Sequence, residues 1–297
     1  MSLCQTQIVQ VRLEERFPGH NFVTKTIKAK ADRDPEVPLV ALGGEGIFVK
    51  ELEAALLDRE IDLAVHSLKD LPVETTPGLR IAAVTEREDP RDAFISRSGK
   101  TLAQLPAGAR VGTSSPRRRS QLLFQRRDLE VADIRGNVDT RLRKLDEGRY
   151  DAIVVAAAGL IRLGLEERIT QYLSPGEMLP EPGQGALAVE TRDGDQMILG
   201  VVETMNDPLS RACVEAERAF LQALGGGCRV PIAAHAEVHQ DALTLTGAVI
   251  AVDGSRRVRG SATGSFLEPV SLGKSLADQL IAQGAQEILA TRLPETK

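Results

Sequence analysis

Tryptophan is absent from this chain, and aromatic residues make up only 3% of it. Proteins bind single-stranded nucleic acids largely by stacking bases on aromatic rings, and nucleic-acid-binding surfaces are usually basic. The formal net charge here is −5. A nucleic-acid-binding protein, whose affinity would fall steeply with salt, is therefore the weakest of the alternatives, and we expect no nucleic-acid partner.

Cysteine is scarce, and long apolar runs are missing. Cys4, Cys213 and Cys228 cannot all pair, and no CxxC motif occurs. Because the four histidines also lack a zinc-site spacing, we predict reduced thiols and no metal site. The longest apolar stretches, such as residues 152–160, fall well short of the roughly 20 residues that span a bilayer, and no signal-like segment opens the chain. The sequence predicts a cytoplasmic protein with no membrane partner.

Strand-like and helix-like patterns alternate through the first half of the chain. We predict strands at residues 61–65, 109–112, 131–134 and 152–156, and helices at 48–57, 117–124 and 138–147. This alternation predicts an α/β fold with a mostly parallel sheet. Ligands of such sheets bind beyond the carboxyl ends of the strands, where helices begin.

Arginine is concentrated between residues 117 and 162. The default interpretation of such residues is a solvated face, but several follow the predicted strand ends directly. Thr113, Ser114 and Ser115 supply hydroxyls and a helix cap before Pro116. We predict that these arginines face an anionic ligand: Arg117, Arg118, Arg135, Arg141 and Arg162. We place these on the solvated face: Arg119, Arg126, Arg127, Arg143 and Arg149.

The chain divides into three predicted parts. The pattern of residues 59–65 is weakly similar to that of residues 148–154. This internal similarity indicates two similar α/β domains, with hinges near residues 87–92 and 180–185. Residues 206–297 read as a small α+β domain with an antiparallel meander and a final helix from about residue 271. The predicted domains are 1–86 completed by 186–204, then 90–180, then 206–297.

Two further residues carry chemistry. Cys228 follows a glycine run after a predicted helix and can anchor a group covalently, whereas Asp70 precedes Leu71 and Pro72 and can move protons. Taken alone, Cys228 reads more often as a small buried residue, Asp70 as a turn aspartate and His66 as a packed core histidine.

A set of motifs in fixed order resembles the porphobilinogen deaminase family, also called hydroxymethylbilane synthases. The matching segments span nearly the whole chain and are residues 46–51, 66–72, 86–93, 112–115, 135–138, 183–186 and 226–228. The resemblance implies two domains like those of type II periplasmic binding proteins around a cleft, plus a small α+β C-terminal domain with a three-stranded antiparallel sheet. It also implies a monomer.

The resemblance implies a reaction as well: head-to-tail condensation of four porphobilinogen molecules into hydroxymethylbilane with release of ammonia. Growth would start from a dipyrromethane cofactor joined to Cys228 by a thioether. Asp70 would be catalytic, and Arg162, Gln184 and Phe48 would contact the substrate. The residues implied to contact the cofactor are Lys69, Ser67, Thr113, Ser114, Ser115, Arg117, Arg118, Arg135, Arg141 and Gly136.

Two departures from the family pattern stand out. Members usually begin with a strand of the type R-I-G-T-R-x-S-x-L-A, whereas this chain opens inside the helix that follows that strand. Either the sequence starts at a false initiator methionine, or the protein truly lacks the strand. We expect lower stability and impaired cofactor assembly without it. Glu45 replaces a common lysine in a glycine-rich loop, for which the resemblance implies a role as a lid. The alternative function is a catalytically impaired or carboxylate-binding two-lobed protein.

Overall fold

The computed structural model describes residues 1–27, 47–226 and 230–290. Cys228 and Glu45 therefore lie outside the described residues, and Phe48 is described only as part of the backbone of a helix. The chain forms two compact units. Unit A comprises residues 2–87 and 186–211, and unit B comprises Met1 and residues 88–185 and 212–297.

Unit A is built on a three-stranded sheet of order β1-β8-β2, in which both pairings are antiparallel. The central strand comes from later in the chain, so Val189 pairs with both Val65 and Ala83. Val9 and Leu13 of the first helix pack against this sheet. The elements of unit A are α1 (Ser2–Arg16), α2 (Ile47–Leu57), β1 (Leu63–Ser67), η2 (Leu68–Asp70), β2 (Leu79–Val84), β8 (Leu187–Arg192), α6 (Gln196–Val202) and η5 (Glu203–Met205).

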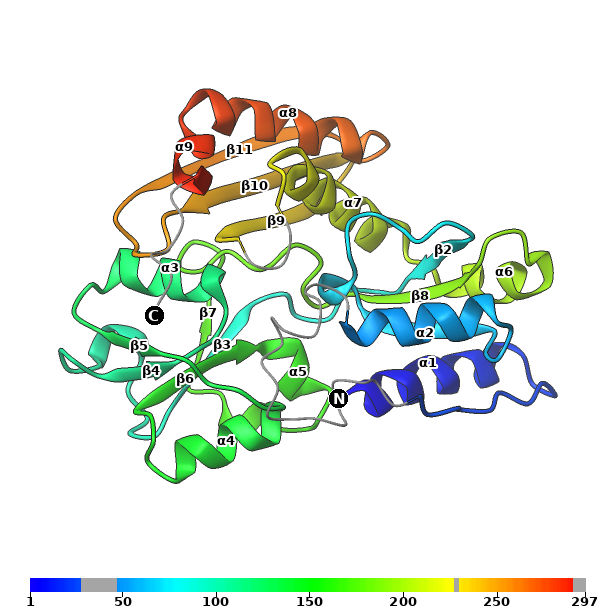
Figure 1. The fold of residues 1–297 in the computed structure, drawn as a ribbon, viewed down its shortest axis with the longest axis horizontal. Coiled ribbons are helices and arrows are strands. Elements are labelled where there is room, and N and C mark those ends of the chain that lie inside the picture. The colour runs from blue at the N-terminus through cyan, green and yellow to red at the C-terminus, as the bar shows by residue number, and fades with distance from the viewer. Residues whose placement is uncertain (28–46, 227–229, 291–297) are drawn as a thin grey trace. The chain divides into compact units, whose positions relative to one another are not determined.

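Unit B begins with a five-stranded mixed sheet of order β5-β4-β6-β3-β7 (Figure 1). Strand β4 is parallel to β5 and β6, whereas β3 is antiparallel to β6 and β7. Its elements are β3 (Asp92–Ser96), η3 (Leu102–Gln104), β4 (Arg110–Gly112), α3 (Pro116–Gln125), β5 (Glu130–Ala132), α4 (Val138–Asp146), β6 (Ala152–Ala156), α5 (Ala157–Ile161), η4 (Glu166–Arg168) and β7 (Gln171–Leu173).

The prediction of a mostly parallel sheet is correct only for β5-β4-β6 and wrong elsewhere. Strands β4, β5 and β6 are joined through helices α3 and α4, which return the chain to the same end of the sheet. Strands β3 and β8 enter their sheets outside that alternation, and both run antiparallel to their neighbours. Asp92, placed at the end of a predicted hinge, is instead the first residue of β3.

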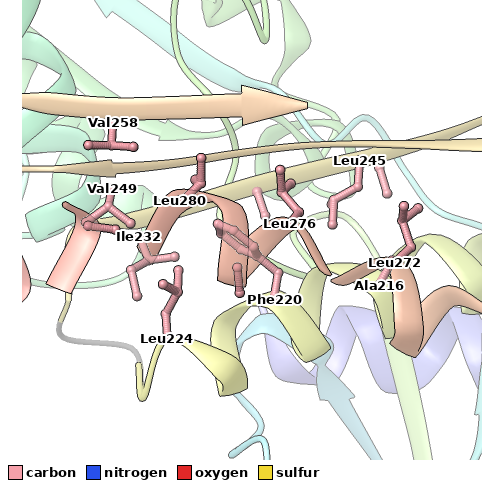
Figure 2. Close-up of a cluster of buried hydrophobic side chains, with 14 of the residues drawn as sticks. Ala216, Phe220, Leu224, Ile232, Leu245, Val249, Val258, Leu272, Leu276 and Leu280 are labelled. Carbon is pink, nitrogen blue, oxygen red and sulfur yellow. The ribbon is translucent and has the colours of Figure 1, made fainter. Parts of the chain in front are cut away.

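The C-terminal part of unit B is an antiparallel meander of order β11-β10-β9, as predicted. Helices α7 and α8 pack on one face of it, where Phe220 and Leu276 meet inward-facing strand residues such as Leu245 (Figure 2). The opposite face, with Ala233 and Ile250, packs on Leu179. The elements of this C-terminal part are α7 (Pro208–Ala223), β9 (Ile232–His239), β10 (Ala242–Ile250), β11 (Arg257–Ser265), α8 (Pro269–Ala282) and α9 (Ala285–Ala290).

Within the described residues, every helix is too short or too polar to cross a bilayer. In the same part of the chain, no three histidine, cysteine or acidic side chains gather as metal ligands would.

Candidate functional site

The carboxyl ends of β4 and β5 are joined by a hydroxyl. Ser114 Oγ donates to the carbonyl oxygen of Ile134 at 2.9 Å and accepts from its N–H at 3.0 Å. The N–H of Thr113 also donates to the carbonyl of Ala132 at 2.9 Å. Because β4 and β5 are parallel, these contacts bring the loops that precede α3 and α4 together at one edge of the sheet.

Helix α3 begins as the sequence predicts. Ser115 is the N-cap, and its Oγ accepts the N–H of Arg118 at 3.4 Å, with Pro116 in the first turn. Thr113 Oγ1 accepts the N–H of Ser115 at 3.2 Å. The three predicted hydroxyls thus shape the loop that delivers Arg117 and Arg118 to the edge.

A buried acid that sequence reasoning missed organises these arginines. Asp92 is completely buried and accepts from Arg117 Nη1 at 2.7 Å and from Arg118 Nε at 3.0 Å. Gln184, also completely buried, donates from Nε2 to Asp92 Oδ1 at 3.0 Å and accepts from Arg118 Nη2 at 3.3 Å. Asp92 pairs with Ala156 at the end of β6, which places its carboxylate at the same edge.

The electrostatics of Asp92 follow from this geometry. Burial by itself raises the pKa of a carboxyl group, but the guanidiniums of Arg117 and Arg118 outweigh it and hold the pKa of Asp92 well below its usual value. Asp92 is therefore ionised at neutral pH.

Arg117 is committed to the protein interior. It is only 2% exposed, and Nη1 donates to the carbonyl oxygen of Leu179 at 2.7 Å as well as to Asp92. Its Nε is buried with no hydrogen-bond partner among the described residues. Any contact of Arg117 with the cofactor stays a prediction.

Arg141, in the first turn of α4, is a half-buried cation beside Arg118. Burial and the nearby charge of Arg118 lower its pKa. Nε donates to the carbonyl oxygen of Gly136 at 2.8 Å, and Arg141 makes no ion pair within the described residues. Gly136 has φ +112°, and a Cβ there would lie 2.7 Å from Cβ of Thr140, so this turn requires glycine.

Two other predicted arginines lie in the same unit. Arg135 follows β5 and is exposed. Arg162 ends α5, and its Nη2 donates to the carbonyl oxygen of Gly185 at 2.6 Å, next to Gln184. Unit B therefore brings together the predicted residues from Thr113 to Arg162, with Gln184.

The predicted acid lies in unit A. Asp70 is exposed at the end of η2, which continues directly from β1, and Lys69 is half-buried beside it. Ser67 Oγ accepts from Gln5 Nε2 at 2.7 Å, so Gln5, a buried residue of α1, also shapes this turn. The backbone of Phe48 belongs to α2 of the same unit.

His66 is buried in β1, as the core interpretation predicts, and its Nε2 lies 3.1 Å from Oε2 of Glu190.

The predicted solvated face is correct for three exposed arginines, Arg127, Arg143 and Arg149. The prediction is wrong for Arg126, whose side chain is 22% exposed. Arg126 donates to the carbonyl oxygens of Leu102 and Leu105 and pairs with Asp128 at 2.6 Å. Arg126 thereby connects the end of α3 to η3. This contact joins segments that are distant in sequence, so no local pattern predicts it. Arg119 is partly covered, with Asp133 at 3.4 Å.

Comparison with known proteins agrees over nearly the whole chain. Residues 1–200 match the family model described as porphobilinogen deaminase, dipyromethane cofactor binding domain. Residues 211–282 match that of the porphobilinogen deaminase C-terminal domain. The porphobilinogen deaminase of Geobacter sulfurreducens is 50% identical over 290 residues, covering 98% of this chain and 91% of the relative. That of Thermus thermophilus is 50% identical over 291 residues, covering 98% and 95%.

Among solved structures, the L-cystine solute receptor of Neisseria gonorrhoeae is 12% identical, covers 76% of this chain and 85% of its own, and gives a TM-score of 0.38. The sequence relatives decide the family. This chain belongs to the porphobilinogen deaminase family of transferases.

Proposed function

We propose that this chain is a hydroxymethylbilane synthase that joins four porphobilinogen molecules head to tail, releases ammonia at each addition and serves tetrapyrrole biosynthesis. Membership of the family and the cationic edge of unit B support this proposal. The resemblance and the cysteine usage also favour a monomer acting in the cytoplasm.

The observation that carries the proposal is the proximity of Arg141 and Arg118. Partial burial, and then the nearby charge of Arg118, lower the pKa of Arg141, and a bound carboxylate would offset both effects. Porphobilinogen carries an acetate and a propionate, so the growing product accumulates carboxylates. A set of guanidiniums suits such a ligand, because each can bind a carboxylate with two hydrogen bonds.

The donor set also fits the dipyrromethane cofactor. Arg135 and Arg141 make no ion pair within the described residues, and the buried Nε of Arg117 has no partner among them. A bound dipyrromethane supplies the pyrrole ring to which new units are joined. We propose that these residues hold it, with Cys228 as the covalent anchor: Ser67, Lys69, Thr113, Ser114, Ser115, Arg117, Arg118, Arg135, Gly136 and Arg141.

Asp70 is the proposed catalytic residue. Each addition breaks the bond between the aminomethyl carbon and nitrogen of porphobilinogen and forms a carbon–carbon bond, so the amine gains a proton and the attacking ring carbon loses one. A carboxylate can stabilise the positive charge that develops when ammonia leaves and can accept the proton. Arg162, Gln184 and Phe48 remain the proposed substrate residues, and the buried amide of Gln184 acts through Arg118.

Intact mass and turnover test this proposal together. Denatured wild-type protein should carry an adduct of two linked pyrrole units that maps to Cys228, and added porphobilinogen should yield ammonia and hydroxymethylbilane. Cys228→Ser should abolish both, whereas Cys4→Ser should retain both. Reversible binding of porphobilinogen without adduct or ammonia would favour the carboxylate-binding alternative instead.

A further inference from the structure

The turn at residues 183–185 supports the arginine pair from behind. Gly183 and Gly185 have φ of 77° and 94°, a conformation that favours glycine, and they present the buried Gln184 between them. The side-chain Nε2 of Gln184 donates to the carbonyl oxygen of Pro90 at 2.7 Å and to Asp92 at 3.0 Å. The position of this turn therefore affects the geometry of Arg118.

A buried carboxylate on α7 holds the turn. Glu217 is completely buried, and its Oε2 accepts the N–H of Gly183 at 2.7 Å. Its Oε1 accepts the N–H of Ala236 in β9 at 2.8 Å. His235 Nδ1 lies 3.7 Å from Oε1. Burial of a carboxylate is costly unless its oxygens are hydrogen-bonded, and here each oxygen accepts from a different segment.

The geometry of β9 places two N–H donors beside Glu217. Among the described strands, β9 lies at one edge of its sheet, and the N–H of Ala234 donates to the carbonyl oxygen of Pro180 at 3.1 Å. Two residues further on, the N–H of Ala236 points the same way, but the chain there presents another N–H, that of Gly183. The Glu217 carboxylate gives each of these two donors an oxygen of its own.

The elements that Glu217 joins also flank the proposed cofactor thiol in sequence. Helix α7 ends five residues before Cys228, and β9 begins four residues after it. A Cβ on Gly226 would lie within 3.0 Å of side-chain atoms of Leu221, Val230 and Ile232, so the two flanks are closely packed.

We infer that Glu217 is a positioning residue that couples α7 and β9, which flank Cys228 in sequence, to the arginine pair, acting through the 183–185 turn and Gln184. The inference rests on the proposed function. Glu217→Gln keeps the size of the side chain but replaces one acceptor oxygen by an NH2 donor. One of the two backbone N–H groups then loses its acceptor.

The test compares Glu217→Gln with Glu177→Gln. Glu177 is an exposed residue of unit B that also accepts a backbone N–H, that of Ser174 at 2.9 Å, so the two substitutions are chemically matched. We expect Glu217→Gln to lower the fraction of protein carrying the two-pyrrole adduct, and to lower kcat per loaded enzyme about 10-fold, the value of one charged hydrogen bond. The KM for porphobilinogen should change little, because Arg135 and Arg141 are untouched.

A double-mutant cycle with Gln184→Ala separates positioning from loss of stability. If Glu217 acts through Gln184, the two effects on kcat are not additive, and Glu217→Gln adds little to Gln184→Ala. Additive effects, or a lower melting temperature with normal loading and kcat per loaded enzyme, would overturn the inference. So would loading and kcat equal to those of Glu177→Gln.

Amide hydrogen exchange keeps the inference testable if Glu217→Gln does not fold. In wild-type protein, loading at Cys228 should slow exchange at residues 183–185 relative to Cys228→Ser protein, since coupling is reciprocal. Equal exchange in a loaded and an unloaded protein would contradict the inference. A wild-type protein that neither loads nor turns over porphobilinogen would count against the proposed function. In that case, amide exchange at residues 183–185 still tests whether Glu217 holds this turn. Faster exchange there in Glu217→Gln than in Glu177→Gln would support the inference, and equal exchange would reject it.

Discussion

Asp92 Oδ2 lies 2.7 Å from Nη1 of Arg117, and neither side chain is more than 2% exposed. This pair anchors the start of α3 to the first residue of β3, and Arg118 shares the same carboxylate. One acid therefore orients two consecutive arginines at the sheet edge.

Asp92→Asn should destabilise the protein severely. Arg117 and Arg118 would remain buried without an anionic partner, and breaking a buried pair costs about 3–5 kcal/mol of unfolding free energy. Asp146→Asn, which removes an exposed ion pair with Arg168 at 2.7 Å, should cost less than about 1 kcal/mol. Urea unfolding at pH 7 measures both, and equal losses would refute the role of Asp92.

The contribution of Asp92 should depend on pH with a defined sign. Its pKa in the folded protein lies below the value of about 3.9 in the unfolded chain. Its stabilisation is therefore complete above the unfolded pKa and is lost as pH falls toward the folded pKa. The difference in stability between wild type and Asp92→Asn should shrink as pH falls below about 4; a constant difference down to pH 3 would contradict this.

Arg141→Ala should impair ligand binding without destabilising the fold. Removing a half-buried cation that Arg118 repels costs little folding energy, but a carboxylate of the cofactor or substrate loses a charged hydrogen bond, about a 10- to 100-fold effect. Adduct fraction and KM for porphobilinogen report this loss. The control is Arg143→Ala on the same helix, whose side chain is 70% exposed. The same adduct fraction and KM in both variants would count against Arg141 as a ligand contact.

Asp70→Asn should reduce kcat by about 100-fold or more, because the amide cannot accept the proton or stabilise the positive charge. The rate is measured on protein whose adduct content has been checked by mass. Asp58→Asn, an exposed aspartate at the end of α2, serves as the control. An active Asp70→Asn enzyme would move the catalytic role to another group.

Gly254→Ala should loosen the contact between the β10–β11 turn and α3. Gly254 has φ +70°, and a Cβ there would lie 2.4 Å from the backbone nitrogen of Phe124. Gly108 has φ +76° with open space around it, so Gly108→Ala isolates the cost of the left-handed conformation, about 1–2 kcal/mol. Thermal unfolding should show a larger loss for Gly254→Ala; equal losses would mean that the backbone contact yields easily.

The sequence was sufficient for features encoded locally. The strand at residues 152–156 was predicted with its observed bounds, and the Ser115 cap, the start of α4 and the C-terminal meander also agree. Apolar periodicity, capping residues and turn residues act within a few positions, so they can be read along the chain. The ordered motifs likewise indicated the family.

Tertiary structure alone decided which charged groups meet. Asp92 is 25 residues from Arg117, and Glu217 is 34 from Gly183, so no local pattern pairs them. The strand that completes the unit A sheet also returns from more than 100 residues away and pairs antiparallel with both of its neighbours. Such contacts depend on burial, where an unpaired charge is costly, and burial is a property of the folded chain.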